Sequence, residues 1–299
     1  MTRIFVAGSS GQVALSLKEA VEHKGITLTT AGRPDFDLTD PDGMRAAITA
    51  FQPTAIVNAA AYTAVDAAED NEEAANAINT EGPRTLAAIA ASIEVPFIHI
   101  STDYVFDGDK DDAYVETDPV SPQGAYGRSK LAGEIAATAS NPNSIILRTA
   151  WVYSPFGNNF LKTMLKLAQN RDELGIVADQ YGNPTYAVDI AEAILEIVQQ
   201  LDAGKPLANV AGVYHLAGSG DTNWHGFASF IFEEGHKYGH PVPKANAIST
   251  AEYPTPAKRP MNSRLNCDKV QEAFSITMPD WRESTAKCVK RLFGEGQLG

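Results

Sequence analysis

The chain has 299 residues, with 24 lysines and arginines against 37 aspartates and glutamates, and a formal net charge of −13. This balance argues against a nucleic-acid partner, because affinity for a phosphate backbone comes from lysine and arginine, although one small anionic ligand could still be held in a locally basic pocket. The two cysteines, the lack of an apolar run of about 18 residues and a start without a signal-peptide pattern predict a soluble, cytoplasmic enzyme with no membrane partner.

The first half of the chain alternates short apolar runs with longer helical stretches. The predicted strands are Ile4–Ala7, Ile26–Thr30, Ala55–Val57, Pro96–Ile100 and Ser144–Leu147. The predicted helices between them are Gln12–His23, Pro41–Phe51, Asn71–Ser92 and Ala125–Ala139. Strands that are apolar throughout and separated by helices indicate an α/β fold with a doubly wound parallel sheet of the Rossmann type. We therefore expect a dinucleotide-binding domain over residues 1–150.

Beyond Trp151 the pattern changes to helices separated by irregular stretches rich in proline, glycine and asparagine. Helices are predicted at Asn159–Asn170, Val188–Leu201 and His225–Tyr238. We expect residues 151–299 to form mainly a smaller, substrate-binding region, with a segment near 187–217 returning to the main sheet.

A glycine-rich turn, Gly8-Ser9-Ser10-Gly11, follows the first strand and opens the first helix with Gln12 and Val13. Glycines let the backbone approach a pyrophosphate, and the helix N-terminus offers unpaired N–H groups to it. The alternative is a plain strand-to-helix turn. Its place at the start of a βαβ unit favours a dinucleotide site.

The end of the second predicted strand bears on the choice of cofactor. An NAD-specific site usually carries an acidic residue there, whereas this chain has Thr30-Ala31-Gly32-Arg33. Arg33 is either a partner for a 2′-phosphate or a solvated loop residue, and Asp37 could still contact the adenosine half. We expect NADPH as the cofactor, with NADH also accepted.

Tyr126 and Lys130 are four residues apart at the start of a predicted helix, so both side chains can reach one site. A nearby cation lowers the pKa of a phenol and suits it to acid–base chemistry. The alternative is a packed tyrosine and a surface lysine. After a dinucleotide-type first half, the catalytic interpretation is favoured.

Thr102 and Asp103 follow the fourth strand, where ligands bind in open parallel sheets. A hydroxyl there can hydrogen-bond a reacting carbonyl, and the alternative is a turn whose polar side chains cap the backbone. A basic stretch in the acidic chain, with Lys258, Arg259 and Arg264, is a candidate for a diphosphate site or a solvated loop. The six histidines show no metal-ligand spacing, so no metal is expected.

Longer motifs accompany these. They are Asn58-Ala59-Ala60-Ala61-Tyr62-Thr63-Ala64-Val65-Asp66, Ser101-Thr102-Asp103-Tyr104-Val105-Phe106, Arg148-Thr149-Ala150-Trp151-Val152-Tyr153, Gly157-Asn158-Asn159-Phe160, Asp179-Gln180-Tyr181-Gly182-Asn183-Pro184-Thr185 and Thr255-Pro256-Ala257-Lys258-Arg259-Pro260 with Ser263-Arg264-Leu265. Together with the glycine turn and the tyrosine–lysine pair, they run in order over nearly the whole chain. The chain resembles the extended short-chain dehydrogenases/reductases and, among them, the dTDP-4-dehydrorhamnose reductase family.

The resemblance implies NAD(P)H-dependent reduction of the 4-keto group of dTDP-4-dehydro-L-rhamnose, the last step of dTDP-L-rhamnose synthesis. It places along the cofactor Gly8, Gly11, Gln12, Val13, Asp37, Leu38, Ala60, Ala61 and Tyr62. It makes Tyr126 the proton donor and Lys130 the holder of the nicotinamide ribose. Thr102, Asp103 and Trp151 would contact or border the sugar.

Two departures from the family pattern stand in the first helix. Ala14 stands where glycine is frequent, and Ser16 stands near a glutamate that belongs to a metal-bridged dimer in some members. We therefore expect a monomer or a homodimer without a metal. Two alternatives remain open: a non-catalytic regulatory subunit like that of methionine adenosyltransferase, or a nucleotide-sugar epimerase or dehydratase that keeps NAD bound through a closed cycle.

Overall fold

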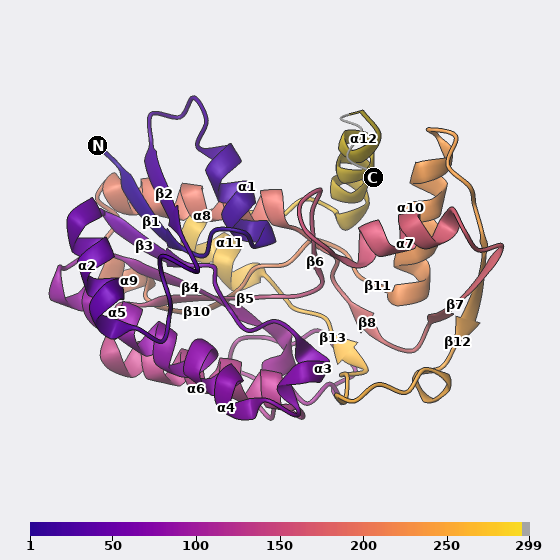
Figure 1. Cartoon of the computed structure of the whole chain (residues 1–299), viewed down its shortest axis with the longest axis horizontal. Coiled ribbons are helices and arrows are strands. Elements are labelled where there is room, and N and C mark those ends of the chain that lie inside the picture. The colour runs from indigo at the N-terminus through magenta and orange to yellow at the C-terminus, as the bar shows by residue number, and fades with distance from the viewer. Residues whose placement is uncertain (295–299) are drawn as a thin grey trace.

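The computed structural model describes residues 1–294, and a six-stranded parallel sheet organises its larger part (Figure 1). The strand order is β10-β5-β4-β3-β1-β2. These strands are β1 (Arg3–Ala7), β2 (Thr27–Ala31), β3 (Ala55–Asn58), β4 (Phe97–Thr102), β5 (Ile145–Thr149) and β10 (Gly212–His215). β2 lies on one side of β1, and the later strands lie on the other side, beginning with β3. Open α/β sheets bind ligands at the carboxyl edge next to such a change of direction. The predicted Rossmann-type fold is confirmed.

Helices cover both faces of the sheet because its strands are apolar on both sides. These helices are α1 (Gln12–Ala20), α2 (Pro41–Phe51), α5 (Gly82–Ser92), α6 (Ala125–Ser140) and α8 (Ala187–Asp202). In β1, Ile4 and Val6 pack into the core under α1 and α8, whereas Phe5 and Ala7 pack into the opposite core under α2 and α5. Figure 1 shows these two layers on either side of the strands.

The helix expected over residues 71–92 is broken in the structure. It comprises α4 (Glu72–Asn76), a π-helical turn at Ala77–Glu81 and α5, and the short helix α3 (Val65–Ala68) precedes it. A Cβ added to Gly133 of α6 would lie 2.0 Å from the Asn79 carbonyl oxygen, so α6 packs directly against the widened turn. The Asn79 side chain accepts from Tyr62 N–H at 2.8 Å. The widened turn therefore follows from tertiary contacts that the apolar periodicity does not contain.

The smaller region has its own core and joins the sheet through α8 and β10. Leu161, Phe227 and Trp281 are buried together in this core. Its principal elements are β6 (Val152–Tyr153), α7 (Phe160–Ala168), β7 (Glu173–Val177), β9 (Thr185–Tyr186), α10 (Trp224–His236), β12 (Lys244–Ile248) and α12 (Trp281–Gly294). β10 pairs with β5 in parallel, and α8 packs beside α1. The division of the chain at residue 150 stays a prediction.

Several elements of this region were not predicted, β7, β12 and α12 among them. The short ones are β8 (Tyr181–Gly182), α9 (Leu207–Val210), β11 (Thr222–Asn223), β13 (Asn262–Ser263) and α11 (Asp268–Phe274). Two-residue strands carry no readable alternation, and α12 has a low mean hydropathy because charged residues fill its outer face. Within residues 1–294 no helix has the length and apolar character that a bilayer crossing requires.

Candidate active site

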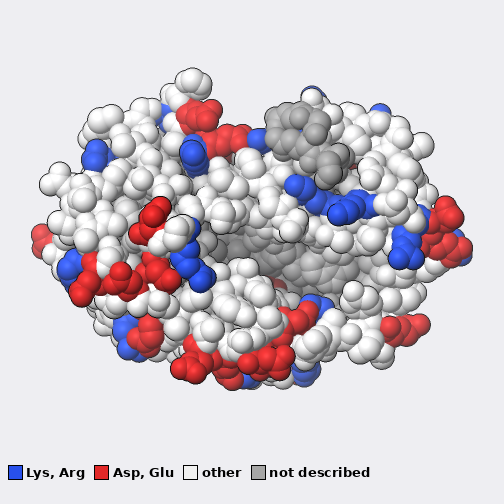
Figure 2. Space-filling view, in the orientation of Figure 1, with Lys and Arg blue, Asp and Glu red and all other residues white. Residues whose placement is uncertain are grey.

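A cavity of about 1100 Å³ lies between the carboxyl edge of the sheet and the smaller region. Figure 2 shows a hollow near the middle of this face, with acidic side chains gathered along the edge below it. The loops after β1, β3 and β4 and the start of α6 form the wall that we call the sheet wall. Residues of β6, α7, β7 and α10 form the facing wall, which we call the aromatic wall.

The glycine turn of the sheet wall passes close to the backbone that follows β3. Gly8 has φ +117°, and a Cβ added there would lie 3.2 Å from backbone atoms of Ala59 and Ala60. Gly11 is the N-cap of α1 and provides no side-chain cap, so the first N–H groups of the helix have no side-chain acceptor there. Because Gly11, Gln12 and the residues beside them line the cavity, this N-terminus suits a pyrophosphate.

The side chain of Gln12 crosses to the aromatic wall. Its Nε2 donates to the Val152 carbonyl at 3.2 Å, and its Oε1 accepts from Ser154 Oγ at 2.8 Å and from Asn159 Nδ2 at 2.9 Å. Asn159 in turn caps α7 through Lys162 N–H. Gln12 therefore ties the glycine turn to the first helix of the smaller region, a role for which the sequence contains no signal.

Tyr126 and Lys130 project from the start of α6 into the cavity, as predicted. Lys130 is 2% exposed, and its Nζ donates to the Ile100 carbonyl at 2.6 Å. Burial lowers the pKa of Lys130 to about 8. Burial also raises the pKa of Tyr126 above its ordinary value, although a hydrogen bond with Thr102 works against this. Lys130 is not among the groups that shift the Tyr126 pKa, so the expected lowering by Lys130 is not seen in this structure.

Thr102 and Asp103 lie at the end of β4, and both are buried beside Tyr126. Thr102 Oγ1 donates to Asp103 Oδ1 at 2.8 Å and accepts from Tyr104 N–H at 3.3 Å. Burial raises the pKa of Asp103 to about 6. Thr102 thus caps a short 3₁₀ turn (η2, Asp103–Val105) and faces the cavity at the same time. The structural interpretation therefore applies, and the functional one stays a prediction.

Two tryptophans form the centre of the aromatic wall. The rings of Trp151 and Trp224 stack with centroids 3.5 Å apart and planes at 9°. Trp151 has φ +48°, and a Cβ added to Gly182 on its other side would lie 2.5 Å from its ring. Trp151 is therefore clamped between Gly182 and Trp224. Sequence reasoning missed Trp224, because only the fold brings the start of α10 to Trp151.

The basic stretch does not enter the cavity as a group. Arg259 lines the cavity, where its Nη2 pairs with Asp66 Oδ2 at 2.9 Å. Lys258 and Arg264 are not among the lining residues; Lys258 Nζ bonds to Gln123 and Arg264 Nε to Asn262. Of the three cations that are candidates for a diphosphate site, only Arg259 therefore lines the cavity. Sequence reasoning also missed Arg171, which lines the cavity beside β7.

Some of the predicted cofactor residues lie outside the cavity lining. Ala60 and Ala61 line it with Gly11, Gln12 and Val13. The others, Gly8, Arg33, Asp37, Leu38 and Tyr62, do not.

Their contacts show what they do in the fold. Asp37 Oδ1 accepts from the backbone and hydroxyl of Thr39, and these bonds lower its pKa together with a smaller effect of Arg33. Leu38 is buried against Gly82, and the backbone of Tyr62 pairs with Asn79. Their roles toward a cofactor stay predictions.

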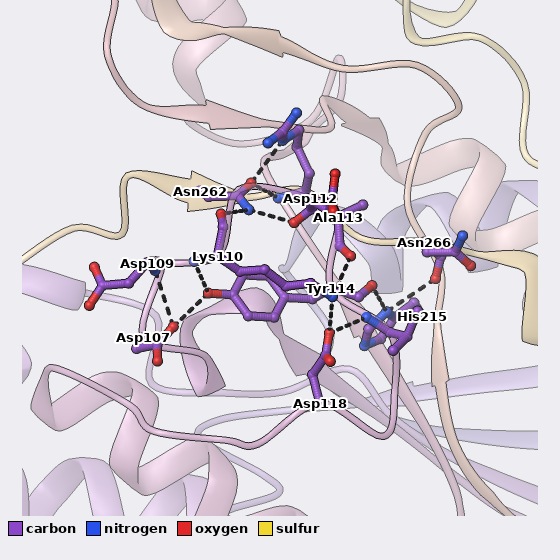
Figure 3. Close-up of polar contacts among 12 residues, drawn as sticks. Asp107, Asp109, Lys110, Asp112, Ala113, Tyr114, Asp118, His215, Asn262 and Asn266 are labelled. Carbon is purple, nitrogen blue, oxygen red and sulfur yellow. Dashed lines mark hydrogen bonds and ion pairs between the residues drawn. The ribbon is translucent and has the colours of Figure 1, made fainter.

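A polar network holds the loop that follows Thr102 (Figure 3). The Tyr114 hydroxyl donates to Asp107 Oδ1 at 2.6 Å and accepts from Lys110 N–H at 3.2 Å. The Nδ1 of His215, on β10, lies 3.1 Å from the carbonyls of both Tyr114 and Asn266. The loop is thereby fixed to the sheet edge and to the C-terminal segment that carries Arg259.

Position 16 of α1 is a serine and not an acidic residue. This serine is buried and donates to the Gln12 carbonyl at 2.8 Å. Over residues 1–294 no group of three or more His, Cys, Asp or Glu side chains is placed to hold a metal ion.

Comparisons with known proteins give one consistent result. Residues 1–293 match the family model described as the RmlD substrate binding domain. A dTDP-4-dehydrorhamnose reductase from Sinorhizobium fredii is 47% identical over 99% of both chains. Among solved structures, a dTDP-4-dehydrorhamnose reductase from Clostridium acetobutylicum has a TM-score of 0.90 and 35% identity over 97% of this chain and 99% of that one. One from Bacillus anthracis in complex with NADP has a TM-score of 0.88 and 31% identity over 96% and 99%.

Proposed function

The chain belongs to the RmlD substrate binding domain family, and from this premise and its cavity we infer an NAD(P)H-dependent reductase of dTDP-rhamnose biosynthesis. It reduces the 4-keto group of dTDP-4-dehydro-L-rhamnose to give dTDP-L-rhamnose. The observation that carries this conclusion is a phenol, Tyr126, on the same cavity wall as an uncapped helix N-terminus. Relatives of the same name match over nearly the whole chain.

Tyr126 acts as the general acid. The reduced nicotinamide, when bound, supplies the hydride to C4 of the sugar. Tyr126 gives its phenolic proton to the 4-oxygen, so the carbonyl becomes a hydroxyl and a phenolate remains. A phenol is protonated at neutral pH, so Tyr126 has a proton to give before the reaction. Thr102, hydrogen-bonded beside it, orients the same oxygen.

The glycine turn and Lys130 hold the cofactor. The N–H groups at the start of α1 would bind the pyrophosphate, and Lys130 Nζ would bind the nicotinamide ribose. NADPH is the expected cofactor and NADH is also accepted, because no carboxylate stands at the end of β2. A relative in complex with NADP and more distant proteins in complex with NAD support this choice.

The aromatic wall receives the nucleotide sugar. We place the sugar against Trp151 and the diphosphate near Arg259, which lies in the cavity with Asp103. As part of the same proposal, the protein acts in the cytoplasm as a monomer or homodimer and without a metal. Neither a nucleic acid nor a membrane is expected as a partner.

The test is oxidation of NADPH or NADH with freshly generated dTDP-4-dehydro-L-rhamnose. We expect stoichiometric oxidation of the cofactor and formation of dTDP-L-rhamnose. A regulatory subunit would bind cofactor without oxidising it. An epimerase or dehydratase would purify with stoichiometric NAD and show no net oxidation. Either of these results would overturn the proposal.

A further inference from the structure

His99 is a buried titratable residue behind the active site that the proposed mechanism does not use. It lies on β4, between Asn58 of β3 and Lys130 of α6, and is 0% exposed. Its Nδ1 is 3.0 Å from Asn58 Nδ2, and its Nε2 is 3.4 Å from Lys130 Nζ. The ring lies nearly parallel to that of Phe97, at 11° with centroids 6.2 Å apart. One imidazole thus joins the loop after β3 to the lysine of the site.

The protonation state of His99 follows from a backbone N–H that can only donate. Ala60 N–H donates to Asn58 Oδ1 at 3.1 Å, so the amide nitrogen of Asn58 faces His99. That nitrogen also only donates, and Nδ1 of His99 must accept. A neutral imidazole with an unprotonated Nδ1 carries its proton on Nε2. An imidazolium would set two donors against each other across 3.0 Å.

The Nε2–H of His99 is directed at Lys130 Nζ, which itself donates to the Ile100 carbonyl. An ammonium group has three donors and no acceptor, whereas an amine has a lone pair that accepts a hydrogen bond. The contact is therefore favourable for the amine and unfavourable for the ammonium. The ring acts on the charge of Lys130 as well as on its position.

We propose that Asn58 and His99 are positioning residues for Lys130: Asn58 holds His99 in the Nε2–H tautomer, and this tautomer favours the uncharged amine. Lys130 then exchanges a proton close to neutral pH, while its Nζ keeps a fixed place at the cavity. Burial acts in the same direction, because it lowers the pKa of His99 well below its usual value and that of Lys130 to about 8. Only the effect on turnover rests on the proposed function.

Among the charged groups around α6, Glu134 opposes this effect. It raises the pKa of Lys130, but its carboxylate is paired with Arg148 of β5 at 2.7 Å. Glu73 of α4 is exposed, and the other acidic groups on the elements packed against α6 have partners. These pairs are Asp66 with Arg259, Glu69 with the Ala125 N–H, Glu72 with Arg128, Glu81 with Arg84 and Asp103 with Thr102.

The tautomer is tested in the wild-type chain, without substrate, by nitrogen NMR of protein labelled with ¹⁵N-histidine. His99→Gln assigns the His99 signals among the six histidines. We expect an unprotonated Nδ1 and a protonated Nε2, unchanged between pH 6 and pH 9. A proton on Nδ1 at pH 7, in either the other tautomer or an imidazolium, would overturn the proposal. The tautomer is read in the wild type and does not depend on the folding of a Lys130 variant.

The effect on Lys130 is tested with His99→Phe, which keeps an aromatic ring but removes Nε2–H. Lysine labelled with ¹³C at Cε reports the pKa of Lys130, with the signal assigned by Lys130→Met. We expect the variant to raise this pKa by about one unit and to shift the matching limb of the pH profile of kcat/KM. A lower or unchanged pKa would contradict the proposal. If the wild type shows no turnover, the proposed function fails while the NMR results still decide this inference.

Discussion

The two walls of the cavity are built in different ways. The sheet wall takes its groups from neighbouring strand ends of one parallel sheet, and the proposed catalytic pair, Tyr126 and Lys130, lies four residues apart on α6. The aromatic wall collects single residues from segments spread over more than 70 positions, such as Trp151 and Trp224. Local sequence thus determines the groups of the sheet wall, whereas long-range packing determines the surface that we propose receives the substrate.

The largest expected effect is on the sheet wall, in Tyr126→Phe. Loss of a positioned general acid typically costs roughly 10²–10⁴-fold in turnover, and cofactor binding should stay nearly unchanged. Steady-state kinetics and NADPH titration measure the two effects. Tyr153→Phe is a matched control, because its buried hydroxyl bonds to Thr285 and is not part of the cavity lining. Near-normal turnover of Tyr126→Phe would remove the tyrosine from the mechanism.

Asp103, on the sheet wall, should make the stability of the protein depend on pH. Burial raises its pKa to about 6, so the folded state binds this proton more tightly than the unfolded chain. The stability that this group contributes is present at low pH and is lost as pH rises through 6. The free energy of unfolding of Asp103→Asn, relative to that of the wild type, should therefore increase by about 2–3 kcal/mol from pH 4 to pH 8. Urea unfolding of both proteins at each pH measures this gain, and parallel pH profiles would contradict it.

The Gln12 side chain connects the two walls through hydrogen bonds, so its removal should lower the stability of the protein. Gln12→Leu loses three hydrogen bonds to the smaller region, each worth about 0.5–1 kcal/mol, so we expect a loss of about 2 kcal/mol in unfolding free energy. Gln12→Glu keeps acceptors for Ser154 and Asn159 but adds a charge near the expected pyrophosphate. It should retain more stability and bind NADPH more weakly. Equal stability of Gln12→Leu and the wild type would refute the connection.

Trp224→Ala tests whether the aromatic wall acts through placement of Trp151. Loss of the stacked ring should reduce kcat/KM for the sugar about tenfold, since aromatic pairs contribute about 0.5–1.5 kcal/mol beyond burial. The affinity for NADPH should not change. Trp224→Phe keeps a stacking ring and should recover most of the activity. If the alanine variant instead loses cofactor affinity, the two walls are not separate in function.

The smallest effect is expected for Arg259→Ala. A remote phosphate contact is made in the ground state and the transition state alike, so the substitution should raise KM more than it lowers kcat. The existing pair with Asp66 limits the increase in KM to about fivefold, because exchange of one partner for another gains little in a solvated site. A KM equal to that of the wild type would move the diphosphate elsewhere in the cavity.

The sequence was sufficient for the parallel sheet and for the sheet wall, because apolar strands and the Tyr126–Lys130 spacing are local patterns. It was insufficient for the π-helical turn at Ala77–Glu81, which depends on contact with α6. It also missed Trp224, since nothing near this residue in the chain indicates that Trp151 lies against it. Gln12 was predicted from its place in the motif, but its side-chain contacts depend on residues about 140 positions away.

The most direct test of the division between the walls is a single-turnover measurement with NADPH bound and the sugar nucleotide varied. For Tyr126→Phe the account predicts a rate at saturating substrate that stays at least about 100-fold below the wild type. For Trp224→Ala it predicts that saturating substrate restores most of the rate. The account would be contradicted if saturating substrate restored the rate of Tyr126→Phe but did not restore the rate of Trp224→Ala.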